Sequence, residues 1–80
     1  MRIKKDINFN KFMDQVDKCQ GEVMFYTDEE DILNLKSTLS KLIFASLANK
    51  PEFLLAGYIK ADLEVDYELL KEYLVSDIED

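Results

Sequence analysis

The chain has 80 residues, 48% of them hydrophobic and 34% charged, which is typical of a single soluble globular domain spanning residues 1–80. It contains no apolar run of the roughly 18 residues that a membrane span requires, and no apolar segment follows its first basic residues. We therefore expect neither a membrane span nor a signal peptide. The only cysteine, Cys19, cannot form an internal disulfide, which favours a cytoplasmic location.

The negative charge is concentrated in the last part of the chain. Residues 1–50 contain eight acidic and eight basic side chains, whereas residues 51–80 contain nine acidic and two basic ones and so carry the whole net charge of −7. Such a surface repels phosphate groups, so nucleic acid is not an expected partner. The acidity is explained either by solubility or by a basic surface on a protein partner.

The spacing of apolar residues predicts strands and helices that alternate along the chain. Strands are expected where apolar and polar residues alternate, and helices where apolar residues recur every three or four positions. The expected elements are a strand over 1–7, a helix over 9–19 capped by Asn8 or Asn10, strands over 22–27 and 32–36, a helix over 38–48, a strand over 53–61, and a helix that starts at Asp62 or Glu64. The apolar stripe of this last helix is expected at Val65, Leu69, Leu70, Tyr73 and Leu74, with a frayed tail over 76–80.

The segment 32–47 changes its hydrophobic period. Leu33 and Leu35 alternate with polar residues, as in a strand with one buried face, and helical spacing follows. The apolar residues of that helix form one stripe, Leu39, Leu42, Ile43 and Leu47. Residues 28–31 are all acidic and predict a solvated hairpin turn, because a calcium loop needs a longer ligand set with a glycine at its bend. One helix over 28–49 is a rival interpretation, which we reject because polar residues would occupy most of its surface.

The order of elements, β-α-β-β-α-β-α, predicts the α+β class. Three helices with one apolar stripe each need a common surface to cover, so we expect a two-layer open-faced sandwich. Its sheet would have four mostly antiparallel strands, with the three helices on one face and solvent on the other.

The open sheet face is expected to carry an apolar patch that could form a contact, including a homodimer. Its residues are Met24, Tyr26, Leu54 and Tyr58, on the parity opposite to Val23, Phe25, Leu55 and Ile59, which would face the helices. The alternative is that one strand has the reverse parity.

The run Leu33-Asn34-Leu35-Lys36-Ser37 resembles the NLKS segment of HPr, the phosphocarrier of the bacterial sugar phosphotransferase system. The element order, the length and an acid-rich turn before the last helix are also similar to HPr. The resemblance implies an HPr-like domain, but HPr has a histidine at the start of its first helix, where this chain has residues 5–10 and no histidine. A phosphohistidine needs an imidazole nucleophile, so the sequence predicts a relative that is not a phosphocarrier.

Ser37 matches the serine of HPr that a dedicated kinase phosphorylates. A phosphate there would lie at a helix N-terminus, which favours an anion. The alternative interpretation is that Ser37 only caps the helix. The resemblance implies a partner-binding surface around this position, formed by Lys36, Thr38, Leu39, Lys41 and Leu42.

No pattern for catalysis is found in the chain. With one cysteine and no histidine, neither a metal site nor thiol catalysis is expected, and no glycine loop suited to a phosphate is present. We therefore expect a cytoplasmic, non-catalytic regulatory or interaction protein that binds no cofactor. The alternatives are an acidic inhibitor or antitoxin-like module that uses residues 62–80, and a homodimeric structural module.

Overall fold

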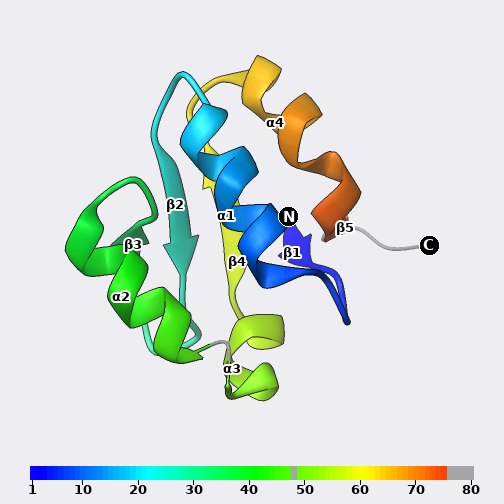
Figure 1. Cartoon of the computed structure of the whole chain (residues 1–80). Coiled ribbons are helices and arrows are strands. Elements are labelled where there is room, and N and C mark those ends of the chain that lie inside the picture. Colours follow the sequence, from blue (N-terminus) through cyan, green and yellow to red (C-terminus); the bar gives the residue numbers. More distant parts are fainter. Residues whose placement is uncertain (48, 76–80) are drawn as a thin grey trace.

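The computed structural model describes residues 1–47 and 49–75, and Figure 1 shows its helices and strands. The described residues form four α-helices, a short 3₁₀ helix and two small antiparallel sheets, so the mixed α+β class is confirmed. In chain order the elements are β1 (Arg2–Ile3), α1 (Phe9–Lys18), β2 (Val23–Tyr26), β3 (Ile32–Asn34), α2 (Thr38–Leu47), α3 (Pro51–Ala56), β4 (Tyr58–Ala61), α4 (Glu64–Leu70), η1 (Lys71–Tyr73) and β5 (Leu74–Val75).

The strands are divided between two sheets, so the predicted four-stranded sheet is not confirmed. In the larger sheet β2 lies between β3 and β4 and is antiparallel to both. β1 and β5 form a separate antiparallel ribbon. This ribbon lies next to β4, because the Met1 ammonium and the Ile59 N–H each donate to the other residue's carbonyl oxygen, at 3.1 and 2.6 Å.

The first helix and the hairpin form where the sequence predicts them. The Asn8 side chain caps α1 by accepting a hydrogen bond from the Lys11 N–H at 3.1 Å. At the hairpin tip, the Thr27 hydroxyl oxygen accepts from the N–H groups of Glu29 and Asp31 at 3.2 and 3.0 Å. Glu30 has a positive φ of 71°, which lets the chain reverse direction within this short loop.

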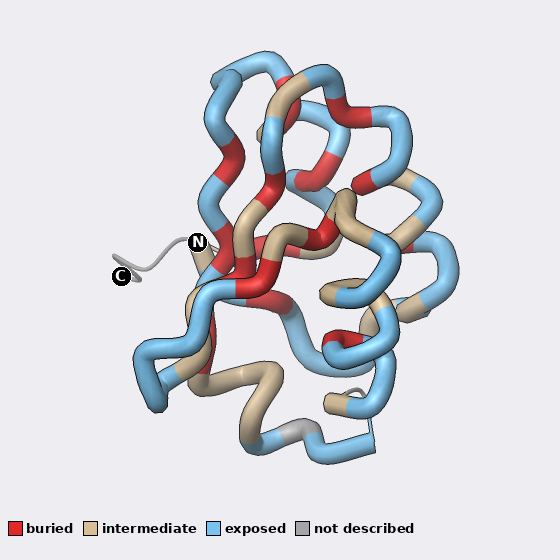
Figure 2. The backbone as a smooth tube through the Cα atoms, turned by 90° about the vertical axis from the view of Figure 1, so that its left-hand side faces the viewer, coloured by how far each residue is buried: buried red, intermediate tan, exposed pale blue. Residues whose placement is uncertain are grey.

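The hydrophobic core lies between the larger sheet and helices α1, α2 and α4, and Phe44 of α2 is at its centre. The Phe44 ring centroid is 5.0 Å from that of Phe25, 5.3 Å from that of Phe9 and 6.2 Å from that of Phe12. Buried and less buried positions alternate along β2, and Figure 2 shows where the buried residues gather along the chain. Val23, Phe25 and Ile59 are fully buried, in agreement with the predicted alternation, but the placement of Leu55 on the same strand face is wrong, because Leu55 lies on α3.

The prediction of a strand over 53–61 is wrong for its first half. Residues 51–56 form α3, and β4 begins only at Tyr58. Proline suits the first turn of a helix, where its missing N–H leaves no hydrogen bond unmade, so Pro51 starts α3 as well as following α2. Gly57 then lets the chain pass close to β2, since a Cβ there would lie 2.5 Å from the Tyr26 carbonyl oxygen.

The end of the chain also differs from the prediction. The last helix begins at Glu64, one of the two expected starts, but it ends at Leu70 and leads through η1 into β5. The expected apolar stripe is wrong at Val65 and Leu69, which are 53% and 38% exposed. The other three members face the core: Leu70 and Leu74 are buried, and Tyr73 packs against the core at its edge. The first strand is shorter than expected, with two residues, and residue 48 and the tail 76–80 lie outside the described residues.

Candidate functional site

Helix α2 exposes most of the apolar residues that the sequence places on its stripe. Leu39 is 68% exposed, Leu42 65% and Ile43 42%, so the expectation that they form a buried face is wrong. Successive helical residues are turned by about 100°, and Phe44 points into the core, so its neighbour Ile43 turns toward solvent. Leu39, Leu42 and Ile43 are three and four positions apart and share one face. We call this exposed set the α2 stripe.

The turn that leads into α2 is ordered mainly by Asn34. Its carbonyl and side-chain oxygens accept from the N–H groups of Ser37 and Lys36, each at 2.9 Å, and its side-chain amide donates to Glu22. The Ser37 carbonyl accepts the first helical bond, from Lys41 N–H, at 2.9 Å. Within residues 1–47 and 49–75 the Ser37 hydroxyl has no hydrogen-bond partner, so the predicted side-chain cap is not formed there.

Two lysines that the sequence assigns to the contact surface link this segment to α1. The Lys36 ammonium donates to the carbonyl oxygen of Cys19, just after α1 ends. The Lys41 ammonium forms an ion pair with Asp17. Lys36 therefore links the turn before α2 to the end of α1, and Lys41 links α2 itself to α1. Thr38 is exposed at the start of α2.

Asp66 is a buried carboxylate that the sequence did not single out. It is fully buried, and its two carboxylate oxygens accept from the N–H groups of Gln20 and Gly21 at 2.9 and 2.8 Å. Burial, and then the Asp66 carboxylate, raise the pKa of the Cys19 thiol, while the Lys36 ammonium acts in the opposite direction. The thiol is therefore kept protonated at neutral pH, which does not suit a nucleophile.

The open face of the larger sheet carries a stacked pair of tyrosines. The rings of Tyr26 and Tyr58 have centroids 4.9 Å apart and an interplanar angle of 9°. Ile32, opposite Tyr26 in the register, is 58% exposed and extends this row across three strands, although the sequence did not place it there. Met24 is half-buried in the neighbouring row. Leu54 is not part of this face, because it lies on α3 and packs against the core.

Comparison of the chain with known protein families, with curated proteins and with solved structures gives no match. None of the helices in the described part of the chain is long and apolar enough to cross a membrane. Among the same residues, no group of three or more histidine, cysteine, aspartate or glutamate side chains is arranged to hold a metal ion.

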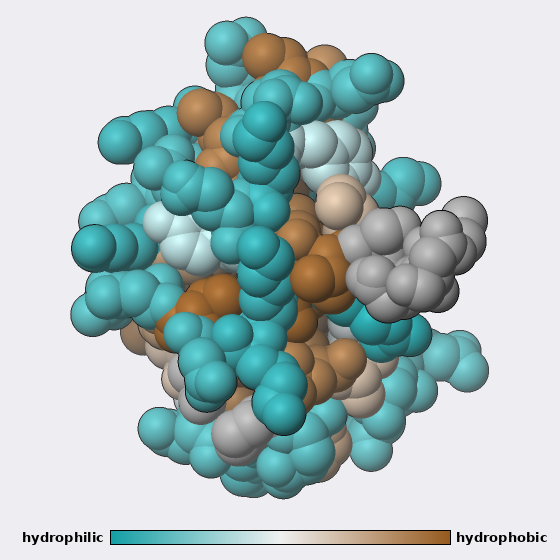
Figure 3. Space-filling view, turned by 90° about the vertical axis from the view of Figure 1, so that its right-hand side faces the viewer, coloured by the Kyte–Doolittle hydropathy of each residue, from teal (hydrophilic) through white to brown (hydrophobic). Residues whose placement is uncertain are grey.

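The acidic C-terminal part presents carboxylates to solvent over the range that the structure describes. The exposed ones are Asp62, Glu64, Glu68 and Glu72. Glu68 pairs with Lys71 at 3.1 Å. The side of the molecule that carries α4 is largely hydrophilic, with apolar patches between the polar groups (Figure 3). The remaining acidic residues of the predicted inhibitory segment 62–80, at 76–80, lie outside the described residues.

Proposed function

We propose that this chain is a small, non-catalytic regulatory protein of the cytoplasm that binds a protein partner through the α2 stripe. The observation that carries the proposal is the exposure of Leu39, Leu42 and Ile43 on one helix face. Fully removing a leucine or isoleucine side chain from water contributes roughly 1.5–3 kcal/mol. Contiguous exposed apolar groups of this size are typical of contact surfaces between proteins.

The proposed fold relationship is to HPr. The order of elements up to α2 and the segment Asn34–Ser37 before that helix support it. The hydrogen bonds between Met1 and Ile59 favour the expected four-stranded sheet, because they bring the ribbon of β1 and β5 next to β4. Helix α3 and strand β5 are additions to the expected order.

A carrier role is not part of the proposal, because the chain has no histidine to accept a phosphoryl group. Incubation with the phosphotransfer enzyme and labelled phosphoenolpyruvate should leave the protein unlabelled. An acid-labile phosphate on the protein would contradict this part of the proposal.

The test of the α2 stripe is affinity capture from the native cytoplasm, with bound proteins quantified by mass spectrometry. The double variant Leu39→Ser/Leu42→Ser should lose the protein that the wild type retains. The control is Val65→Ser, which removes an exposed apolar side chain, 53% exposed, from α4. Both variants must first show the wild-type circular dichroism spectrum. A partner retained equally by both variants would refute the assignment to α2.

The proposed switch at Ser37 is tested with the same partner. A negative charge at this position lies two residues before Leu39, where the α2 stripe begins, and changes the desolvation of that surface. Ser37→Asp should therefore alter affinity, whereas Ser37→Ala should bind like the wild type. If the two variants bind identically, Ser37 is not a switch.

A second candidate function is a homodimer through the open sheet face. The row of Ile32, Tyr26 and Tyr58 favours it, because it crosses all three strands of the larger sheet and combines apolar with aromatic groups. Sedimentation at high protein concentration tests this candidate. A monomer would exclude it, and a dimer that dissociates in Tyr58→Lys would support it.

An acidic inhibitor that uses residues 62–80 makes a different prediction for salt. A partner held by exposed carboxylates should be released as ionic strength rises from about 0.05 to about 0.5 M, since the Debye length then shortens to a few ångströms. A partner held by Leu39 and Leu42 should remain bound over the same range.

A further inference from the structure

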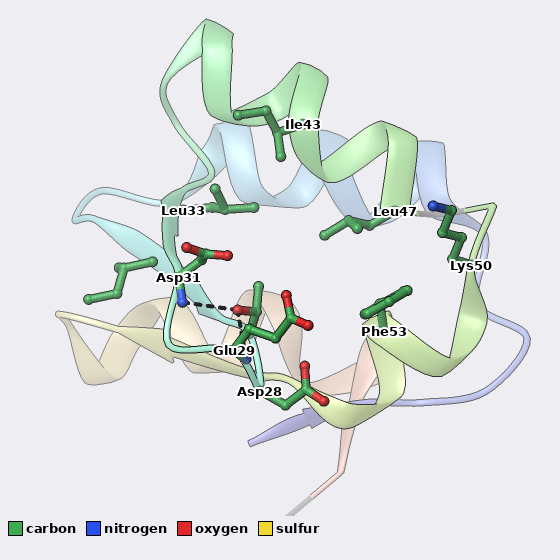
Figure 4. A pocket seen from close by; sticks show the side chains of 10 residues that line it. Asp28, Glu29, Asp31, Leu33, Ile43, Leu47, Lys50 and Phe53 are labelled. Atoms are coloured by element: carbon green, nitrogen blue, oxygen red, sulfur yellow. Dashed lines mark hydrogen bonds between the residues drawn. The ribbon is translucent and has the colours of Figure 1, made fainter.

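A groove of about 460 Å³ lies between the tip of the β2–β3 hairpin and the corner where α2 leads into α3. Apolar side chains from three elements line it, namely Ile32, Leu33, Ile43, Leu47 and Phe53. Figure 4 shows Ile43 above the space and Leu33 at the left, next to Asp31. Leu47 and Phe53 lie at the right, with Lys50 above Phe53. We call this space the hairpin groove. Its volume falls within the roughly 300–1,000 Å³ of ordinary binding pockets, so it can admit one or two side chains.

The hairpin tip contributes carboxylates to the rim of the hairpin groove (Figure 4). Asp28, Glu29 and Asp31 line it, and the carboxylates of Glu29 and Asp31 point into the space in Figure 4. These three groups form no ion pair with any residue in the described part of the chain. The hydrogen bonds that hold the hairpin tip use backbone groups and the Thr27 hydroxyl, and so they leave the carboxylates without a partner.

The hairpin groove continues into the α2 stripe, because Ile43 belongs to both. A ligand that filled the groove alone would leave Leu39 and Leu42 in water, whereas a length of polypeptide can cover the groove and the stripe together. The three carboxylates outnumber the single ammonium of Lys50, and this imbalance selects a positively charged occupant.

We infer that the hairpin groove binds a basic segment of the protein partner, in which an apolar side chain is flanked by lysine or arginine. The apolar side chain enters between Ile43 and Phe53, and the flanking cations meet Glu29 and Asp31 at the rim. This inference rests on the proposed function, since it assigns to the same partner a second contact beside the α2 stripe.

The test uses nuclear magnetic resonance titration of the ¹⁵N-labelled full chain with three short synthetic peptides. One alternates leucine with arginine, a second replaces arginine by glutamate, and a third replaces leucine by serine. The leucine–arginine peptide should shift the amide signals of Ile43, Leu47 and Phe53, and the other two peptides should bind at least about tenfold more weakly.

Two double variants with the same change in net charge locate the contact. Glu29→Gln/Asp31→Asn should weaken the leucine–arginine peptide by about tenfold, because two ion pairs at the rim are lost. The matched control, Asp62→Asn/Glu64→Gln, removes two exposed carboxylates near α4 and should leave the affinity unchanged. Equal weakening by both double variants would overturn the inference, because it would mean a general attraction between opposite charges.

Four further outcomes would also overturn it. Equal binding of the leucine–glutamate peptide would exclude a basic occupant, and equal binding of the serine–arginine peptide would exclude the apolar contact. Shifts of the groove signals on concentrating the protein alone would mean that a second copy of the chain is the occupant. Amide shifts confined to Leu39 and Leu42 would refute binding in the groove but leave the proposed function standing. If the native partner binds Leu39→Ser/Leu42→Ser as tightly as the wild type, the proposed function itself is refuted.

Discussion

Replacement of Asp66 by asparagine is expected to destabilise the protein strongly, although it only replaces one carboxylate oxygen by an NH₂ group. Both carboxylate oxygens accept from backbone N–H groups, those of Gln20 and Gly21, in a fully buried position. An asparagine keeps one acceptor and turns an NH₂ group toward the other N–H, so one charge-assisted bond is lost and a buried donor is left unsatisfied. We expect Asp66→Asn to cost about 2–3 kcal/mol of the free energy of unfolding.

The assay is thermal and urea unfolding followed by circular dichroism. For a domain of this size each kcal/mol lowers the Tm by about 4–8 °C, so the variant should melt roughly 10–20 °C below the wild type. Amide hydrogen exchange at Gln20 and Gly21 should accelerate in the same variant. The control Asp62→Asn changes an exposed carboxylate and should stay within about 0.5 kcal/mol of the wild type. A Tm of Asp66→Asn within a few degrees of the wild type would refute the assignment of Asp66 as the acceptor of both N–H groups.

Three further predictions concern stability. Gly57→Ala should lower the free energy of unfolding by an amount near the upper end of the roughly 1–3 kcal/mol that overpacking costs, because the new Cβ would lie 2.5 Å from the backbone oxygen of Tyr26. Gly21→Ala should cost less in the same urea titration, because its new Cβ first meets a flexible side chain. Glu30→Gly should raise the free energy of unfolding by about 0.5–1 kcal/mol, since glycine accepts the positive φ at no steric cost. The urea midpoint should rise accordingly, and an unchanged midpoint would contradict this prediction. Burial raises the pKa of the Cys19 thiol, so this thiol ionises at lower pH in the unfolded chain than in the folded one. The free energy of unfolding should therefore fall as pH rises above about 8.5. Measured between about pH 7 and about pH 10, it should change less with pH in Cys19→Ala.

Local signals in the sequence were sufficient for the first helix, the hairpin and the start of α2. The Asn8 cap and the acidic turn depend on neighbours in the chain, and both form as predicted. Helix α3 was missed because a short apolar run has no period that separates a buried helix from a strand, and Pro51 was interpreted only as the end of α2.

The orientation of α2 could not be predicted, because it depends on what lies opposite. The sequence offers two apolar faces, one with Leu39 and Leu42 and one with Phe44. Phe44 faces the core because its ring packs against the Phe25 ring, and this contact exists only in the folded chain. The burial of Asp66 likewise depends on two N–H groups more than 40 positions earlier, and no local pattern announces such a pairing.

The ribbon of β1 and β5 has a consequence for the order in which the molecule can be completed during synthesis. Arg2 pairs with Val75 and Ile3 with Leu74, so β1 leaves the ribosome before β5 and obtains this partner only after almost the whole described chain has followed it. Closing so long a loop carries a large entropic cost until the core is in place. Until then one edge of β1 is exposed, and an exposed strand edge is a site where chaperones act and where nascent chains aggregate. The docking of β5 is thus a late step of folding, and a nascent chain stalled before Leu74 should lack it.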